Sequence, residues 1–386
     1  MREISSQTPA VTPFLSKETT DSVSHNFHRL ALLCPQAEDN EMDVDSREMV
    51  KTHGEDVLRF ASAMQSGWPP GPSRLQGASA LADKFWNCMR FACIHLRGDE
   101  PLSPDLQASS DMERWFLQRL NTATAHLNDH FERNRLSPAC ARLQQMIRHD
   151  LSGWFLESSR RHMHNPTSRQ CVRYAMLHVA HLLHPLMPNI TQEAFFRLSA
   201  SPEKLFLQLP FPEFRSELVF PQATRRTQQL HKLVGDIRGI VNLHLLPASI
   251  RLTVILSSED PAIRRLMRSH TEDITQLSGI SDLRTHESPP SHAIRTASRS
   301  WSIFIPLNDF QTHASIRIVL RKEKEELSRR IHRMQRKLGD RNFMDSVTPD
   351  TARRWKLRLQ QDLRRRERVI RTLGLLTEAP AATTEK

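Results

Sequence analysis

Aromatic and basic residues are interleaved over residues 81–96, whose sequence is LADKFWNCMRFACIHL. The stretch reads as one helix, on which Phe85 and Met89 repeat at the spacing of a single face. Aromatic rings and guanidinium planes can stack on unpaired nucleic-acid bases, so Phe91, with Lys84 and Arg90 nearby, is a candidate base-binding residue. The pattern alone also fits a core aromatic at Phe91, and more simply, because apolar helical stripes usually face the core.

A second candidate for nucleic-acid chemistry lies near the C-terminus, where positive charge is concentrated. Residues 321–371 hold 18 Lys and Arg against 8 Asp and Glu, a net of +10 in a chain whose total is +11. Neutralising phosphates releases counterions, so a concentrated basic segment is typical of proteins that bind nucleic acid. An Arg-rich, solvated coiled coil explains the charge equally well.

Heptad spacing organises this basic segment into two helices. The first has a seam of Leu320, Leu327, Ile331, Met334 and Leu338, and the second has Trp355, Leu359, Leu363, Ile370 and Leu373, interrupted by Arg366. The break at GDRNF predicts an antiparallel hairpin with helices of about 35 Å each. Facing seams leave these cations pointing outward: Arg329, Arg330, Arg333, Arg336, Lys337, Arg353, Arg354, Arg358, Arg364, Arg365 and Arg368.

Other kinds of chemistry find little support in the sequence. His178, His181 and His184 sit three apart on a helix, but no carboxylate or cysteine completes a metal set, so we expect surface or capping histidines and no metal. With 11 glycines, the chain has neither a GxGxxG nor a GxxxxGK[ST] phosphate loop. Its five cysteines lack CxxC spacing, which predicts neither a disulfide framework nor structural zinc and fits a reducing compartment. No apolar run is long enough for a membrane span.

Helical periodicity and turn residues predict a mainly α protein. Five amphipathic helices with short connections, after a helix through GEDVLRFASAM, indicate an antiparallel bundle. The third of these is expected to run without interruption from Ser137 to Phe155. Strands are predicted at residues 249–256 and 300–307, with helices at 222–242 and 261–270, which makes a small α/β domain. The expected organisation is disorder at 1–47, the helical bundle at 48–200, a proline-rich linker at 201–221, an α/β connector at 222–312, the coiled-coil arm at 313–376 and a tail at 377–386.

Four segments occur in an order that resembles the anticodon-binding region of class I aminoacyl-tRNA synthetases. They are HGEDVLRFASAM, LADKFWNCMRFACIHL, LSGWFLESSRRHM and LLHPLMPNITQEAFFRL. Within that class the chain most resembles the valine–tRNA ligase family, over residues 52–376. The choice of the valine family within this class rests on the coiled-coil arm, which has Asn342 and Phe343 at its tip. Isoleucine enzymes tend to carry zinc cysteines near the end, and leucine enzymes lack the arm.

The resemblance implies a role for particular residues. Phe91 matches an aromatic that stacks on an anticodon base, Lys84 matches a lysine near the same nucleotides, and Arg90 is carried with them. An arginine about eighteen residues before Phe91 is expected to pair with the stacking site, and Arg74 is the nearest candidate. The arm is expected to bind the outer corner of the tRNA through Arg329, Arg333, Arg336, Lys337, Arg354, Arg358 and Arg365.

Departures from the family pattern limit what is expected of this chain. Asp83 stands where the family usually has Asn, and Ser152 with Gly153 replaces a Cys-Asp or similar pair. The His-Ile-Gly-His and Lys-Met-Ser-Lys-Ser motifs, which bind ATP, do not occur in the 386 residues. We therefore expect no cofactor on this chain, ATP and Mg²⁺ belonging to the complete family enzyme, and no activation of valine by the chain alone.

Three functional hypotheses follow. The first is the tRNA-binding part of a valine–tRNA ligase-like protein, with valine tRNA as its partner. The second is a non-catalytic helical scaffold whose coiled coil binds a protein. The third is a ligase that acts with a catalytic half on another chain. A cytoplasmic location is expected, with a mitochondrial one left open.

Overall fold

The computed structural model describes residues 44–64, 69–96, 107–199, 206–244, 246, 252–285, 290, 293–306, 310–340, 343 and 347–377. The expected disorder of residues 1–47, for all but its last four residues, lies outside this range, as do Asn342 and nearly all of the expected tail. Contacts divide the chain into two units, residues 1–227 and 228–386. The finer division expected from the sequence stays a prediction.

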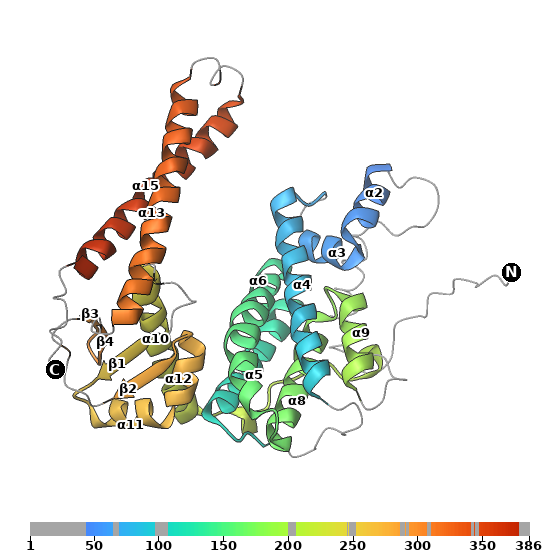
Figure 1. Ribbon diagram of the computed structural model, residues 1–386. Coiled ribbons are helices and arrows are strands. Elements are labelled where there is room, and N and C mark those ends of the chain that lie inside the picture. The colour runs from blue at the N-terminus through green and yellow to red at the C-terminus, as the bar shows by residue number, and fades with distance from the viewer. Residues whose placement is uncertain are drawn as a thin grey trace. The chain divides into compact units, whose positions relative to one another are not determined.

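The first unit is a bundle of helices (Figure 1). Its larger helices are α2 (Val44–His53), α3 (Glu55–Ala63), α4 (Pro72–His95), α5 (Asp111–Glu132), α6 (Leu136–Gln145), α8 (Pro166–Leu183) and α9 (Pro188–Leu198), and the shorter ones are α7 (Leu156–Ser159), η2 (Arg160–His162), η3 (Phe206–Gln208) and η4 (Ser216–Leu218). A π-helix, η1 (Met146–Phe155), lies between α6 and α7.

Local signals explain where several of these helices begin. Ser110 and Glu113 form a capping box at the start of α5, each side chain bonding the backbone of the other. The Asn165 side chain accepts a hydrogen bond from the Thr167 amide, and Pro166 occupies the first turn of α8, where its missing N–H costs nothing. Such caps satisfy amides that would otherwise lack partners, so the short loops between helices suffice to reverse the chain.

The third helix of the bundle differs from expectation. Instead of one α-helix to Phe155, the chain passes from α6 into the π-helical turns of η1. In η1 the Ser152 hydroxyl donates to the Arg148 carbonyl, 2.9 Å away. The Phe155 ring stacks on Phe116 of α5, with ring centroids 4.2 Å apart. Apolar periodicity cannot distinguish π from α turns over so short a stretch, because both place apolar residues on the core side.

The second unit contains a four-stranded mixed sheet of order β2-β1-β4-β3. β1 (Thr253–Ser257) is parallel to β2 (Asp282–Thr285) and antiparallel to β4 (Ser302–Pro306), which pairs with β3 (Ala293–Ala297). The connection from β1 to β2 holds α11 (Pro261–Ser269) and α12 (Thr271–Ser278), and α10 (Pro221–Leu243) precedes the sheet. The Trp301 indole N–H donates to Asp236 of α10, 3.1 Å away.

The two inner strands of this sheet were predicted, and the two outer strands were not. β1 buries three consecutive residues, whereas β2 and β3 each bury a single one, Leu283 and Ile294. A strand at the edge of a small sheet needs little apolar sequence, so it leaves no alternating pattern to detect.

The remaining helices, α13 (Phe310–Gly339) and α15 (Pro349–Thr377), lie side by side (Figure 1). Cross-helix contacts show that they are antiparallel, since Glu323 pairs with Arg365 and, further along α13, Lys337 lies over Trp355. At 30 and 29 residues they are each about 45 Å long rather than the expected 35 Å. The expected mainly α fold, with a small α/β domain and a C-terminal helical hairpin, is confirmed. Among the described residues, no helix meets the length and hydropathy needed to cross a membrane.

Candidate nucleic-acid interface

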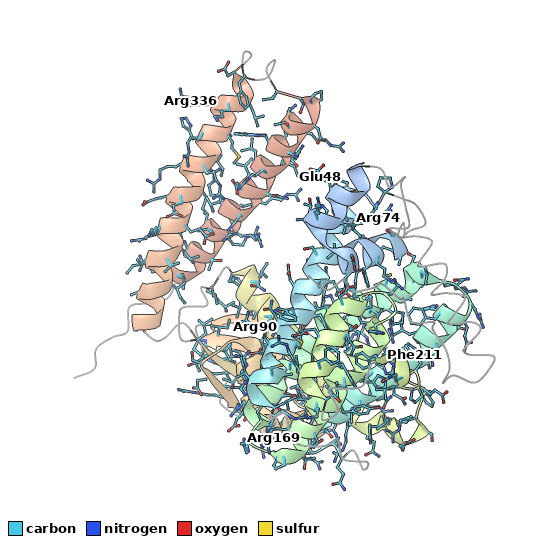
Figure 2. All side chains as sticks on the ribbon, turned by 90° about the vertical axis from the view of Figure 1, so that its right-hand side faces the viewer. Glu48, Arg74, Arg90, Arg169, Phe211 and Arg336 are labelled. Atoms are coloured by element: carbon cyan, nitrogen blue, oxygen red, sulfur yellow. The ribbon has the colours of Figure 1, made fainter. Side chains whose placement is uncertain are left out.

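The core packing of α4 decides which of its side chains reach the surface. Leu81, Phe85, Met89 and Ala92 are at most 1% exposed and turn one face of the helix inward. Lys84 and Arg90 are exposed, and Phe91 is half-buried (Figure 2 labels Arg90). Phe91 is therefore not a core residue, although the pattern alone favoured one.

Two neighbours hold the ring of Phe91. The His95 ring lies 4.6 Å away between centroids, at an angle of 54°. The Arg160 guanidinium lies 5.7 Å from the centre of the Phe91 ring, a cation–π distance. An aromatic ring held between an imidazole and a guanidinium forms a polar, partly open platform, which suits a planar base.

Sequence reasoning missed Arg160. It lies in η2, sixty-nine residues after Phe91, and only the folding of the bundle brings the two together. Arg160 also contacts Glu157 one turn earlier, at 3.5 Å. A second cation–π contact on α4 joins Arg197 of α9 to Trp86, 5.7 Å from the ring centre. The only sequence signal was the basic run Arg160–Arg161 inside a segment already assigned to the bundle.

Partly buried polar contacts join η1, which precedes the turn that carries Arg160, to α5 and α4. Arg119 of α5 donates from Nη2 to Asp150, 2.8 Å away, and Asp150 is almost fully buried. Arg148 donates to the Gly77 carbonyl of α4 at 2.7 Å. Phe91 lies on α4, and Arg160 lies in η2, which follows η1 along the chain after the short helix α7. The hydrogen bond between η1 and α4 therefore helps to keep the two residues close together.

The structure does not bring the four predicted anticodon residues together. Lys84 and Phe91 are seven residues apart, so they lie on the same face, about 10 Å apart along the axis. Arg74 sits in the first turn of α4, about 25 Å from Phe91 along that axis, and it has its own contacts. Figure 2 shows Arg74 and Arg90 at separate levels of the bundle. In the structure the guanidinium beside the Phe91 ring is that of Arg160, and a role for Arg74 at the anticodon stays a prediction.

Of the three spaced histidines, one caps a helix, as expected, and the other two are partly exposed. His184 occupies the C-terminal cap of α8 but is buried, and its Nδ1 lies 2.8 Å from the Thr191 hydroxyl. His178 is partly buried between Thr124 and Tyr174, with Nε2 2.8 Å and Nδ1 3.1 Å from their oxygens. His181 stacks on Phe206, centroids 4.6 Å apart.

These histidines are neutral at physiological pH. Burial lowers the pKa of His178 to about 4, that of His181 to about 3 and that of His184 to about 4. The Thr124 hydroxyl already donates to the Leu120 carbonyl, so it accepts from His178, which assigns the ring proton to Nε2. Among the described residues no group of three His, Cys, Asp or Glu side chains could hold a metal ion.

The seam of the hairpin differs between its two helices. On α13, Leu320, Leu327, Ile331 and Met334 are at most 5% exposed, as predicted. On α15, the predicted Ile370 is 47% exposed and the adjacent Val369 is buried instead. The expected Leu363 position likewise shifts by one, to the buried carboxylate of Asp362. The seam of α15 thus includes a polar position, Asp362, which a pattern of apolar residues does not mark.

Ion pairs reduce the number of cations that are free on the hairpin. Arg330 and Arg365, both expected to point outward, pair with Asp362 and Glu323 at 2.6 Å, and Arg354 pairs with Asp350 at 2.9 Å. Within the described part of the hairpin, no ion pair involves Arg329, Arg333, Arg336, Arg353, Arg358, Arg364 or Arg368. These seven guanidinium groups contribute to the positive surface of the hairpin.

Known proteins with similar sequences include tRNA ligases. Residues 113–251 match the family model of the anticodon-binding domain of tRNA ligase. A valine–tRNA ligase of Carboxydothermus hydrogenoformans is 28% identical over 355 residues, covering 86% of this chain and 39% of the relative. Those of Clostridium acetobutylicum and Geobacter sulfurreducens are 25% and 24% identical, covering 79% and 86% of this chain and 36% and 39% of each relative.

The matches cover this chain and its relatives unevenly. The matches include most of this chain, but the chain spans less than two fifths of the length of these relatives. The predicted resemblance is confirmed for that part of the family. This chain is therefore homologous to the C-terminal 36–39% of valine–tRNA ligases and contains the anticodon-binding domain of a tRNA ligase.

Proposed function

We propose that this chain is the tRNA-binding part of a valine–tRNA ligase-like protein. The α4 surface around Phe91 binds the anticodon, and the hairpin of α13 and α15 binds the outer corner of the tRNA. The observation that carries the proposal is the Phe91 platform: a half-buried aromatic ring beside Arg160, on a helix that also exposes Lys84 and Arg90. The partner proposed for it is valine tRNA.

The division of labour follows from the two kinds of surface. An aromatic platform binds an unstacked base and can discriminate among nucleotides, because bases present edges as well as faces. Guanidinium groups along a hairpin bind phosphates and position the RNA without reading its sequence. The hairpin then supplies salt-dependent affinity, and the platform supplies preference for one anticodon. Aminoacylation itself, with its ATP and Mg²⁺, stays with the complete family enzyme.

Binding of unmodified tRNA transcripts to the purified chain tests the proposal. We expect a valine tRNA to bind more tightly than a tRNA that differs from it only in the anticodon. Phe91→Ala should remove most of that difference. Equal affinity for both transcripts would contradict anticodon recognition, and no binding of either would contradict an RNA-binding role for the chain.

One observation favours the scaffold as a second candidate. The hairpin exposes apolar side chains away from its seam, with Ile318 at 68%, Leu357 at 57% and Ile370 at 47%. If the hairpin binds a protein through them, Leu357→Lys should abolish that contact and leave tRNA affinity unchanged. If it binds tRNA, neutralising its unpaired arginines should weaken tRNA binding instead.

A further inference from the structure

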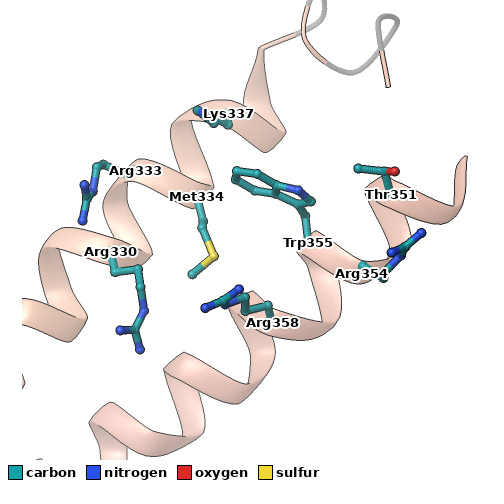
Figure 3. A pocket seen from close by; sticks show the side chains of 8 residues that line it. All are labelled: Arg330, Arg333, Met334, Lys337, Thr351, Arg354, Trp355 and Arg358. Atoms are coloured by element: carbon teal, nitrogen blue, oxygen red, sulfur yellow. The ribbon is translucent and has the colours of Figure 1, made fainter. Parts of the chain in front are cut away.

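A pocket of about 470 Å³ opens between the two helices of the hairpin (Figure 3). The Trp355 ring extends from α15 toward α13, opposite Met334 and Lys337 (Figure 3). Met334 is 5% exposed and gives the pocket an apolar floor. The hairpin seam is therefore incomplete at this level, and an aromatic ring stands beside open space.

Two neighbouring side chains, Lys337 and Phe343, hold the Trp355 ring in place. The Lys337 ammonium lies 5.1 Å from its centre, and the Phe343 ring meets it edge-on with centroids 5.5 Å apart. Lys337 is also 5.4 Å from the centre of the Phe343 ring. A ring positioned in this way loses little side-chain entropy when a planar ligand stacks on it, which favours binding.

The rim of the pocket is positively charged. Arg333, Lys337, Arg354 and Arg358 contribute to it, and none of the described lining residues is acidic. Arg354 pairs with Asp350, but this pair is about three-quarters exposed and so is screened by water. Neither Arg333 nor Arg358 forms an ion pair in the described part of the chain. An apolar aromatic floor under unpaired guanidinium groups suits a ligand that is both planar and anionic.

We propose that this pocket binds a nucleotide, with its base on Trp355 and its phosphate between Arg333 and Arg358. The proposal rests on the RNA-binding role proposed for the hairpin and specifies one contact within it. The nucleotide comes either from an unpaired position of the bound tRNA or from a free mononucleotide, since both present the same base and phosphate. An acidic protein segment would need the cations but not the ring, so the ring distinguishes these partners.

The first experiment measures binding of 5′-AMP to the full chain by calorimetry, with ribose 5-phosphate as the control that lacks a base. We expect 5′-AMP to bind about 5- to 150-fold more tightly, the range that base stacking on an aromatic side chain provides. Trp355→Leu keeps an apolar residue in the seam and should remove this preference, whereas Trp355→Phe should retain most of it. Circular dichroism shows whether each variant keeps its helices.

The second experiment repeats the titration with tRNA. Trp355→Leu should weaken tRNA binding about 5- to 150-fold without changing its salt dependence, because stacking releases no counterions. Arg333→Gln with Arg358→Gln should weaken both 5′-AMP and tRNA binding. Arg353→Gln with Arg364→Gln removes the same charge outside the pocket and should leave 5′-AMP binding as it is.

The outcomes separate this inference from the proposed function. If tRNA binds with a steep salt dependence but Trp355→Leu matches the wild type toward both ligands, the pocket is not a nucleotide site and the RNA-binding role stands. If tRNA does not bind but 5′-AMP binds through Trp355, the site takes free mononucleotides and the proposed function is wrong. If 5′-AMP and ribose 5-phosphate bind with equal affinity, and Trp355→Leu leaves the affinity for tRNA unchanged, the pocket attracts anions without binding a base. That result would overturn the inference.

Discussion

Arg330 donates two hydrogen bonds, from Nε and Nη2, to the two carboxylate oxygens of Asp362 across the hairpin, each 2.6 Å long. Asp362 occupies a seam position of α15 and its side chain is only 9% exposed, whereas that of Arg330 is 42% exposed. The hydrogen bonds from Arg330 lower the pKa of Asp362. A fork of this kind joins one position of α13 to one position of α15, and so specifies how the two helices align.

Replacing Arg330 and replacing Asp362 should change the stability of the protein in different ways. Arg330→Met leaves a nearly buried carboxylate without its partner and should lower the free energy of unfolding by about 1–2 kcal/mol. Asp362→Leu places an apolar residue in the seam and should be neutral or stabilising, at the expense of a defined alignment. Thermal unfolding of both variants at pH 7 makes the comparison. Equal destabilisation by the two would show that the pair itself, rather than the isolated charge, carries the energy.

The same pair predicts a dependence on pH. Because the folded-state pKa of Asp362 is below its unfolded value, its stabilising contribution is present above the unfolded pKa of about 3.9 and is lost as the pH falls below it. The difference in stability between wild type and Asp362→Leu should therefore shift in favour of the variant under acid conditions. Unfolding measured at pH 7 and pH 3 checks the direction.

Phe91 and Phe85 provide a matched test of surface against core on one helix. Phe85 is fully buried, so Phe85→Ala should cost about 3–5 kcal/mol of stability. Phe91→Ala should cost much less stability but should weaken binding of valine tRNA by about 1–3 kcal/mol. Arg160→Met should weaken binding in the same direction. A large fall in the melting temperature of Phe91→Ala, with unchanged tRNA affinity of the folded protein, would show that Phe91 acts as a core residue.

The unpaired arginines of α13 should control the response of binding to salt. Arg329→Gln with Arg336→Gln should flatten the plot of log affinity for tRNA against log salt concentration by roughly 0.7–0.9 for each phosphate that the variant no longer neutralises. Arg365→Gln should flatten it less, because Glu323 already neutralises Arg365 in the free protein. Fluorescence titrations at several salt concentrations give the slopes, and identical slopes for all variants would exclude the hairpin as the phosphate-binding surface.

The buried histidines predict loss of stability in mild acid. Burial holds the pKa values of His178 and His184 at about 4, below the unfolded value of about 6.5. Between these values the unfolded chain binds more protons, so stability is complete above about pH 6.5 and declines as the pH falls toward 4. Between pH 7 and pH 5 each histidine should contribute up to about 2 kcal/mol of that loss. Urea unfolding at both pH values measures it, and His178→Gln should be less sensitive than the wild type.

Much of the fold could be predicted from the sequence, because local signals mark the long helices. Ser110 with Glu113 and Asn165 with Pro166 mark helix starts, and the apolar residues at helical spacing are the ones that became the core. The inner strands and the α13 seam were accessible for the same reason. Short edge strands such as β2, and the π turns of η1, lack such signals and were missed.

The candidate site, like the fold, could be predicted only in part from the sequence. That α4 carries both aromatic and basic residues, and that positive charge gathers between residues 321 and 371, are properties of the sequence, since composition and helical period are local. Whether Phe91 is core or platform depended on which face of α4 the bundle covers. The guanidinium beside it comes from Arg160 rather than Arg74, because packing joins residues far apart in the chain. On the hairpin, the sequence determined the number of cations, but only the pairing of α13 with α15 decided that Asp362 and Glu323 would engage two of them and leave Trp355 beside an open, cationic pocket.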